Sequence, residues 1–475
     1  MLNEFARIVQ EHIAARRRFA TATVIRVHGS ASAKPGSKAI IDASGRNVFG
    51  WVGGGCAESM VREEALQALA EGRTRIVDVD LDDEVLGVGM PCGGNMQVYI
   101  EPHYPARPLL IAGHNRLAQH LAALGALAGY AVTVQAPQAR AESFPTAQRV
   151  LAGGWGELAA TADTHVVVAT DHDGHAPALA AALRGHPAYL GLVARRQVSA
   201  AIFKRLRAEG IGDEALASIR TPAGLHLGGS SLEEISLSIV AEMLATDRRK
   251  AAYPLRMVKG GHAGLDLAQA PAADAAPGGS APGGAVTGGA VTGGAVTGGA
   301  ATPPPELLIV GQGRIAEELA RLGLILRWPV TVNATGEPTA NFPEQVRIVA
   351  GDLDFSRMDV HARTFVVVAT LHKSDHLSME RALAGRAPYI GLIASQRRSR
   401  LVLDFLRERG HTGEALRNVF APAGLDLGAL TPFEIALSIL SEIVGVARGG
   451  TCRPLSEVES LPSSGKPDAC LQRFE

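Results

Sequence analysis

The stretch Thr364-Phe-Val-Val-Val-Ala-Thr370 repeats Thr164-His-Val-Val-Val-Ala-Thr170 at a spacing of 200 residues. Each run is short, continuous and apolar, which is typical of a strand that is buried on both faces of a parallel sheet. The match around the two runs extends over about 140 residues. The chain therefore carries the same domain twice, and its function should lie in what the copies share and in where they differ.

Strands and helices are expected to alternate through both copies. The first copy has strand-like runs at 109–111, 132–134, 166–169 and 189–193, with a helix at 117–127. The second copy has runs at 307–310, 330–332, 365–369 and 389–393, with a helix at 315–322. This order predicts two Rossmann-like, doubly wound parallel-sheet domains, which we place at 106–250 and 306–449.

The remaining segments have no copy elsewhere in the chain. Residues 1–105 contain strand-like runs, mostly separated by Gly-bearing turns, and a strong helix at 57–71, which predicts an α+β domain. Residues 251–305 are rich in Gly, Ala, Pro and Thr and predict a flexible, disordered linker. A coil of roughly 45 residues would span about 35–40 Å, enough for flanking domains to separate or to pack freely. Residues 450–475 form a tail. The expected fold class is α/β, with an α+β domain before two Rossmann-like domains.

Composition limits the choice of partners and compartment. The 46 basic and 47 acidic side chains leave a net charge of −1, so nothing indicates a nucleic-acid surface or binding to an anionic membrane. No apolar run approaches the length of a membrane span, and the amphipathic start lacks a secretory pattern. The four cysteines match neither a disulfide framework nor a zinc pattern. We therefore expect a cytoplasmic protein with reduced thiols.

The second copy opens with a candidate phosphate-binding loop. Its strand runs into Gly311-Gln-Gly313-Arg-Ile-Ala316, a G-x-G-x-x-A pattern before a helix. Gly311 would permit the turn, and Gly313 would let the backbone approach a phosphate at the helix N-terminus. The first copy has Gly113-His-Asn115 instead, and the Asn115 side chain would crowd a pyrophosphate. On this feature the second copy is the stronger candidate for binding a ligand.

A dedicated NAD site should also place Asp or Glu at the end of the second strand, to bind the adenosine ribose. These positions hold Gln135 and Asn333. An amide can still hydrogen-bond a hydroxyl, so the substitution weakens the prediction of a nicotinamide cofactor without excluding it.

Later loops at the same edge of each sheet carry further candidates. His172 and His372 follow the repeated strand and can contact phosphate or transfer a proton, or they can be solvated loop residues. The second copy then has Ser395, Arg397 and Arg398, and paired arginines at a strand end suit a phosphate or a pyrophosphate. The alternative is a solvated helix start. The first copy has Arg195 and Arg196 in this loop.

The N-terminal domain carries the most reactive candidates. Gly53-Gly-Gly55-Cys56-Ala-Glu58 opens the predicted helix and puts Cys56 at its N-terminus, where the dipole and free N–H groups favour the thiolate. A thiolate there can ligate a soft metal such as molybdenum, or accept and pass on a sulfur atom. Cys92 lies in a second Gly-rich loop. For both thiols the alternative is a small buried apolar side chain.

Taken together, these motifs resemble the XdhC/CoxI maturation factors, accessory proteins of xanthine dehydrogenase and aerobic carbon monoxide dehydrogenase. The resemblance rests on Gly29–Gly36, Gly53–Glu58, Cys92-Gly-Gly94 before the strand ending Ile100-Glu-Pro102, and Pro422–Ile439. It covers nearly the whole chain outside the linker and the tail. Family members usually have one Rossmann-like domain, whereas this chain has a fused duplicate.

The resemblance implies a chaperone and not a turnover enzyme. Such a protein binds molybdenum cofactor, as molybdopterin or its cytosine dinucleotide, protects it during sulfuration and delivers it to an apo molybdenum hydroxylase. A cysteine desulfurase is a further candidate partner, and homodimerisation rests on the resemblance alone. The residues carried into this prediction are Cys56, also as the molybdenum or sulfur contact, Cys92, Gly55, Glu58, Gly311, Gly313, His372, Ser395, Arg397 and Arg398.

Neither copy has the Asp after the second strand that family members tend to show. The second copy keeps Gly311-Gln-Gly313 and Ser395 with the two arginines, whereas the first keeps less of the pattern, so we expect ligand binding in the second copy and a scaffolding or partner-binding role for the first. Two other classes remain open from sequence: an NAD(P)-dependent oxidoreductase, favoured by G-x-G-x-x-A alone, and a non-catalytic nucleotide-sensing or docking protein with bivalent partner binding.

Overall fold

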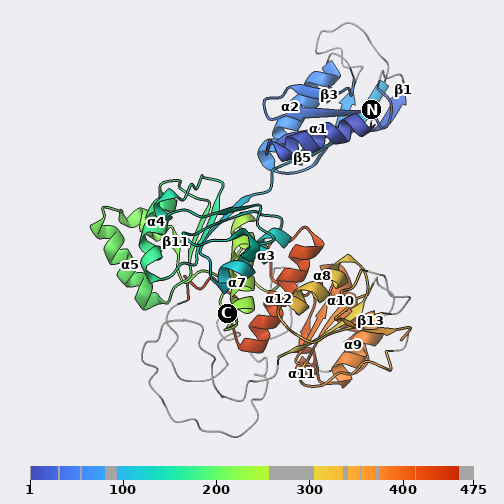
Figure 1. Cartoon of the computed structure of the whole chain (residues 1–475). Coiled ribbons are helices and arrows are strands. Elements are labelled where there is room, and N and C mark those ends of the chain that lie inside the picture. Colours follow the sequence, from blue (N-terminus) through green and yellow to red (C-terminus); the bar gives the residue numbers. More distant parts are fainter. Residues whose placement is uncertain are drawn as a thin grey trace. The chain divides into compact units, whose positions relative to one another are not determined.

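The computed structural model describes residues 2–29, 33–53, 56–80, 94–255, 304–334, 341–352, 355–370, 375–411 and 413–458. The chain divides into two compact units, Met1–Arg107 and Pro108–Glu475. The second unit contains both copies of the repeated domain (Figure 1).

The N-terminal unit is an antiparallel sheet with helices. Its sheet has the strand order β3-β2-β1-β5-β4. The elements are α1 (Leu2–Ala14), β1 (Phe19–Gly29), β2 (Lys38–Asp42), β3 (Asn47–Gly50), α2 (Cys56–Glu71), β4 (Arg75–Asp80) and β5 (Gly94–His103). Alternate residues of β1, namely Ala20, Ala22 and Val24, are buried with Val61 and Ala65 of α2 in one apolar core. The period of two in the strand and the apolar stripe of the helix thus form the predicted α+β unit.

The first copy is a six-stranded parallel sheet of order β11-β10-β9-β6-β7-β8. Its strands are β6 (Pro108–Ala112), β7 (Ala131–Gln135), β8 (Arg149–Leu151), β9 (His165–Val168), β10 (Tyr189–Leu192) and β11 (Ile219–Arg220). Its helices are α3 (Arg116–Leu127), α4 (His175–Leu183), α5 (Arg196–Ala208), α6 (Asp213–Ala217) and α7 (Leu232–Asp247), with short 3₁₀ turns η2 (Ala141–Ser143), η3 (Trp155–Glu157) and η4 (His172–Gly174). When these strands are numbered 1 to 6 along the chain, their order in the sheet is 3-2-1-4-5-6, the arrangement of dinucleotide-binding sheets.

The second copy repeats this sheet in the order β14-β13-β12-β15-β16-β17. Its strands are β12 (Glu306–Gly311), β13 (Val330–Ala334), β14 (Arg347–Ala350), β15 (Thr364–Ala369), β16 (Tyr389–Leu392) and β17 (Val419–Phe420). Its helices are α8 (Arg314–Ile325), α9 (Asp375–Ala384), α10 (Gln396–Glu408), α11 (Gly413–Leu416) and α12 (Pro432–Arg448). The two doubly wound sheets and the antiparallel N-terminal sheet confirm the predicted fold class.

The two copies share one apolar core. Helix α7 is buried at every residue from Ser236 to Ala245, and α12 at every residue from Ala436 to Gly445. A helix buried all round needs cover on two sides. Each of these helices packs on its own sheet and also against the other, and they lie side by side in Figure 1. The copies are therefore joined into one body by the helix that closes each domain.

The segment after α7 (residues 248–255) lies against the second copy, and the segment after α12 (residues 449–458) lies against the first copy. We call these two the exchanged segments. Leu255 N donates to Gly424 O at 2.8 Å, and Leu455 N donates to Gly224 O at 2.8 Å. The sequence predicts a linker that begins at residue 251 and a tail that begins at residue 450. The structure describes the first copy's chain as far as residue 255 and the second copy's chain as far as residue 458. Backbone hydrogen bonds to the other copy hold these extensions, and no local composition signals them.

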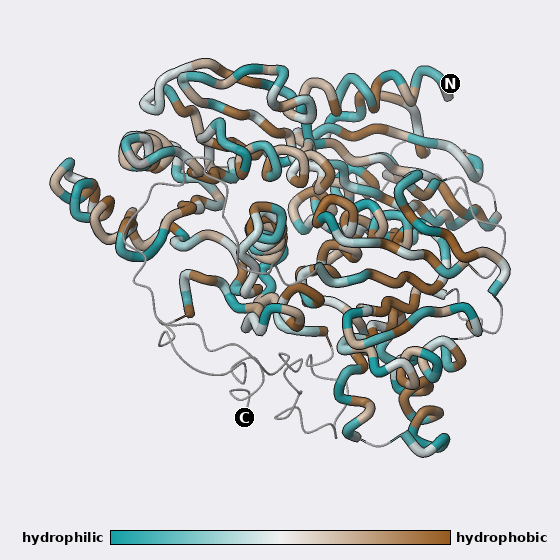
Figure 2. The backbone as a smooth tube through the Cα atoms, turned by 60° about the horizontal axis from the view of Figure 1, so that its bottom comes forward, coloured by the Kyte–Doolittle hydropathy of each residue, from teal (hydrophilic) through white to brown (hydrophobic). Residues whose placement is uncertain are grey.

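Apolar residues follow the strands and the inward faces of the helices (Figure 2). Within the described ranges, no helix is long and apolar enough to cross a membrane.

Candidate functional site

The glycine loop of the second copy lies between β12 and α8, at the carboxyl edge of the sheet. A Cβ on Gly311 would lie 2.5 Å from Ala369 O, so this glycine is required for the close packing of the loop on β15. Gly313 is the N-cap of α8 with φ 120° and ψ 178°, a conformation that essentially only glycine adopts. A Cβ on Gly313 would meet nothing within 4 Å. The space beside Gly313 is therefore open to a ligand.

The N-terminus of α8 has the character of an anion site. Over the described residues, no side chain caps this helix. Its first N–H groups and its dipole consequently face the open side of Gly313. Oε1 of Gln312, between the two glycines, is buried and has no hydrogen-bond partner among the described residues. The loop thus offers backbone donors to an anion and one unsatisfied acceptor.

The corresponding loop of the first copy is closed by its own side chain. Gly113 repeats the packing role of Gly311, because its Cβ would lie 2.4 Å from Ala169 O. Asn115 is the N-cap of α3 with φ −78°, and its Oδ1 accepts from Ala118 N at 3.0 Å. Its Nδ2 donates to Ala169 O at 2.8 Å. Asn115 therefore caps α3 with its own side chain, at the position that Gly313 has in the second copy.

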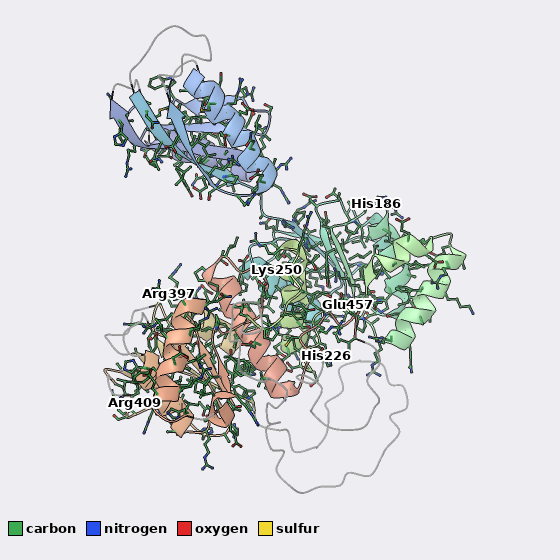
Figure 3. All side chains as sticks on the ribbon, turned by 180° about the vertical axis from the view of Figure 1, so that it is seen from behind. His186, His226, Lys250, Arg397, Arg409 and Glu457 are labelled. Atoms are coloured by element: carbon green, nitrogen blue, oxygen red, sulfur yellow. The ribbon has the colours of Figure 1, made fainter. Side chains whose placement is uncertain are left out.

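A second group of polar residues meets at the same edge of the second sheet. Asp375 opens α9 and is 1% exposed. Arg398 Nε donates to Asp375 Oδ2 at 3.1 Å, and Thr370 Oγ1 donates to Asp375 Oδ1. Ser395 is the N-cap of α10 and accepts from Arg398 N at 3.3 Å. Arg397, on the same helix, is exposed (Figure 3). A buried carboxylate therefore sets the orientation of one of the two predicted arginines.

The first copy lacks the carboxylate and the oriented arginine of this arrangement. His175 replaces Asp375 and lies 2.7 Å from Thr170 Oγ1 through Nδ1. Val198 stands where the second copy has Arg398. Arg196 donates instead to the carbonyl oxygens of Leu455 and Val458, from the end of the chain. The first-copy arginine thus binds the exchanged segment.

The amides that replace the expected ribose-binding carboxylate have partners inside each domain. Asn333 Nδ2 donates to Asp352 Oδ2 at 2.7 Å, and both residues are buried. Gln135 Nε2 donates to Gly154 O at 3.0 Å. In both copies the amide donor is therefore used to hold the following loop.

The N-terminal candidates are described only in part. Helix α2 begins at Cys56. Glu58 Oε1 accepts from Asn47 Nδ2 at 3.1 Å, which ties the first turn of α2 to the start of β3. Gly55 and Cys92 lie outside the described residues, as does the side chain of Cys56. His372, a candidate from the second copy, also lies outside them.

Two cavities occur away from the glycine loops. One of about 50 Å³ lies over β12 and β13 and is lined by Asn333, Arg347 and Arg357 among others. A larger one of about 300 Å³ lies between the end of α7 and the segment that follows α12, beside Arg220, Glu242 and Arg453. No group of three or more His, Cys, Asp or Glu side chains suited to a metal ion occurs in the described part of the chain.

Sequence reasoning missed Asp375 and Gln312. The sequence could have indicated Asp375, because Asp375 and His175 are polar residues that lie five positions after the threonine at the end of each repeated stretch. For Gln312 no comparable signal exists, because the lack of a partner for its oxygen depends on the packing around it.

The fold and the site define a class of protein: an α+β domain joined to paired Rossmann-like domains with one open glycine loop. A model of the XdhC Rossmann domain matches residues 109–243 and again 307–443, and a model of the XdhC and CoxI family matches residues 12–80. The chain belongs to the XdhC family, as its motifs predict.

The relatives include two proteins of Escherichia coli (strain K12). The uncharacterized protein YqeB is 30% identical over 235 residues, which is 48% of this chain and 43% of YqeB. The molybdenum cofactor insertion chaperone PaoD is 26% identical over 260 residues, which is 46% of this chain and 81% of PaoD. This chain thus spans less than half the length of YqeB. A crystal structure described as a xanthine dehydrogenase from Bacillus halodurans has 18% identity and a TM-score of 0.30, over 51% of this chain and 95% of that one.

Proposed function

We propose that this protein is a molybdenum cofactor chaperone that binds the cofactor, protects it during sulfuration and inserts it into a molybdenum hydroxylase. The open glycine loop at the uncapped N-terminus of α8 is the observation that carries the proposal. Membership of the XdhC family and the similarity to the insertion chaperone PaoD support it. In this role the cofactor is cargo, and the protein itself catalyses no turnover.

The residues of the second copy fit the anionic end of such a cargo. Molybdopterin and its cytosine dinucleotide carry phosphate, which binds well to helix N-termini and to guanidinium groups. Gly313 leaves room for the phosphate to approach the backbone. Arg398, whose charge is paired with that of Asp375, presents a guanidinium group in a fixed orientation at the same sheet edge, and Arg397 supplies an exposed positive charge.

Asp375 gives Arg398 a defined orientation before any ligand arrives. A free arginine loses rotamer freedom when it binds an anion, and that loss opposes binding. Because the guanidinium of Arg398 is already tied through Nε, less entropy remains to be lost. A guanidinium carries N–H donors in a rigid planar fork, and this geometry matches phosphate oxygens.

The N-terminal unit supplies the thiol chemistry in this proposal. Cys56 begins α2, and the N-terminus of a helix favours the thiolate form that binds soft metals and transfers sulfur. Cys92 is proposed as a second thiol at the cofactor. The apo hydroxylase would be the acceptor and a cysteine desulfurase the source of sulfur.

The test is to purify the protein from cells that make molybdenum cofactor and to measure released pterin and molybdenum. We expect both with the wild-type chain, and reduced amounts with Cys56→Ala. Gly313→Ala should lose most of the pterin, whereas Asn115→Ala, in the closed loop of the first copy, should keep it. A wild-type chain without pterin would contradict the function, and a Gly313→Ala variant with full pterin content would contradict the site.

The shared core determines how the test is designed. Deleting residues 306–449 would expose the apolar surface of α7 and thus destabilise the first copy as well. Point variants in the two loops avoid this effect, because neither loop takes part in the packing of α7 on α12.

A further inference from the structure

The contacts between the two copies include a set that obeys two-fold symmetry. Arg248 Nη2 lies 3.4 Å from Glu434 Oε1, and Arg448 Nη2 lies 2.9 Å from Glu234 Oε1. The second pair of residues is the first pair with the copies exchanged. The exchanged segments obey the same symmetry, since His226 N donates to Arg453 O and Asp426 N to Tyr253 O, both at 2.7 Å. Such a self-complementary face is typical of a two-fold dimer.

A second set of contacts breaks the symmetry. Lys250 Nζ lies 3.2 Å from Asp426 Oδ2, whereas the equivalent residues on the other side are Gly450 and His226. Arg327 Nε lies 2.9 Å from Glu233 Oε1. In the second copy, Phe433 stands at the position of Glu233. If two second copies paired through this face, Arg327 of one would meet Phe433 of the other and would have no carboxylate to bind.

Sterics add a stronger asymmetry at Gly450. A Cβ on this residue would lie 2.3 Å from the carbonyl carbon of Leu227 and 2.5 Å from His226 O. Both neighbours are backbone atoms of the first copy, so they cannot move aside as a side chain would. The first copy therefore accepts only glycine at this point, and its own residue in the equivalent position is Lys250. Two first copies cannot pair in this geometry without a clash.

We infer that this face selects the pairing of a first copy with a second copy: two first copies clash at the position of Gly450, and two second copies lose both ion pairs. Attraction comes from the Lys250–Asp426 and Arg327–Glu233 pairs, and rejection from the backbone contact at Gly450. Specificity of this kind combines favourable contacts with built-in clashes. The second copy, with the open glycine loop, is thus always joined to a first copy whose loop is closed, and the face is satisfied within one chain.

The intact chain favours this pairing further. A flexible tether between two binding faces gives an effective concentration in the millimolar range. The two copies are joined in one chain, with residues 256–303 between them. At ordinary protein concentrations the internal pair should therefore exclude dimerisation of the whole protein through the same face.

The test is to insert a protease site between residues 256 and 303, cleave the purified chain and measure mass by light scattering on a sizing column. The two fragments should stay together as a one-to-one complex with the mass of the uncut chain. Separate fragments at micromolar concentration would overturn the inference. In a second step, the uncut chain should run as a monomer at the same concentrations, and a dimer formed through this face would equally overturn the inference.

Variants of the cleaved protein test the mechanism of selection. Gly450→Lys should dissociate the fragments, while Gly410→Lys, at an open position with nothing within 4 Å of its Cβ, should not. Asp426→Lys should weaken the complex about tenfold, and Lys250→Asp combined with Asp426→Lys should restore it. Circular dichroism of each variant before cleavage shows that it is folded. None of these readouts depends on molybdenum cofactor, so failure here is distinct from failure of the proposed function.

Discussion

Arg398 donates from Nε to Oδ2 of Asp375 at 3.1 Å, and this carboxylate is the most deeply buried acid at the carboxyl edge of the second sheet among the residues described there. The Arg398 side chain is 32% exposed, so the guanidinium reaches the surface at this edge of the sheet. An arginine that is oriented by a buried carboxylate and reaches the surface is suited to hold an anion in a fixed place.

We expect Arg398→Gln to weaken cofactor retention at least about tenfold, since a hydrogen bond to a charged group contributes about 1.5–3 kcal/mol. Asp375→Asn should weaken it less and should lower the free energy of unfolding by about 1–2 kcal/mol, because water partly screens the exposed side of Arg398. Pterin content and urea denaturation measure the two effects. Arg407→Gln, at the far end of α10, is the control and should change neither.

Gly313→Ala separates backbone strain from ligand access. The variant should lose about 1–3 kcal/mol of stability, because alanine is strained at the positive φ of Gly313. It should also lose its bound cofactor. Gly410→Ala imposes a residue with a Cβ at another positive φ, 88°, also with nothing within 4 Å. This control should lose stability and keep the cofactor. If both variants kept it, the open space beside Gly313 would have no role in binding.

His226 should make the docking of the C-terminal segment sensitive to pH. Its Nδ1 accepts from Thr451 N at 3.0 Å, and burial lowers the pKa of the ring below its ordinary value of about 6.5. The folded state thus favours the neutral ring. The stability that His226 contributes is fully present above pH 6.5 and is lost as the pH falls through 6.5 towards the folded pKa.

The measurement is the difference in unfolding free energy between wild type and His226→Gln at several pH values. This difference should be larger at pH 7.5 than at pH 5.5, and other titrating groups cancel in it because both proteins carry them. A difference that is constant with pH would mean that His226 titrates alike in the folded and unfolded chain.

A buried tyrosine–glutamate pair occurs in both copies with nearly the same geometry. Tyr189 Oη donates to Glu242 Oε2 at 2.6 Å, and Tyr389 Oη donates to Glu442 Oε2 at 2.7 Å. The same two oxygens accept from Gly224 N and Gly424 N at 2.8 Å, which holds the loops that carry the exchanged contacts. Burial raises the pKa of Glu242 and, with the nearby Glu242 charge, raises that of Tyr189.

Tyr189→Phe and Tyr389→Phe should each lower the free energy of unfolding by about 1–3 kcal/mol, because each leaves a buried carboxyl with one donor fewer. Since the copies share a core, both variants should shift a single cooperative transition of this unit. Denaturation followed by tryptophan fluorescence and by circular dichroism tests this. Two separate transitions would show that the copies unfold independently.

Local patterns determined the domains and the asymmetry between the loops. Continuous apolar strands such as Val166–Val168 can be buried only in a covered parallel sheet, and they specify it within a few residues. The contrast between Gly313 and Asn115 is equally local, because one Cβ and one capping side chain decide whether a helix N-terminus is open.

The tertiary structure alone decided how these parts combine. The sequence separates the copies by a segment rich in Gly, Ala, Pro and Thr and leaves their pairing open, while the structure joins them through α7 and α12. It also brings Asp375 to Arg398 and carries the end of each copy onto the other. Such contacts join residues that have no fixed spacing in the chain, so no periodicity encodes them, and they form only when two folded surfaces fit each other.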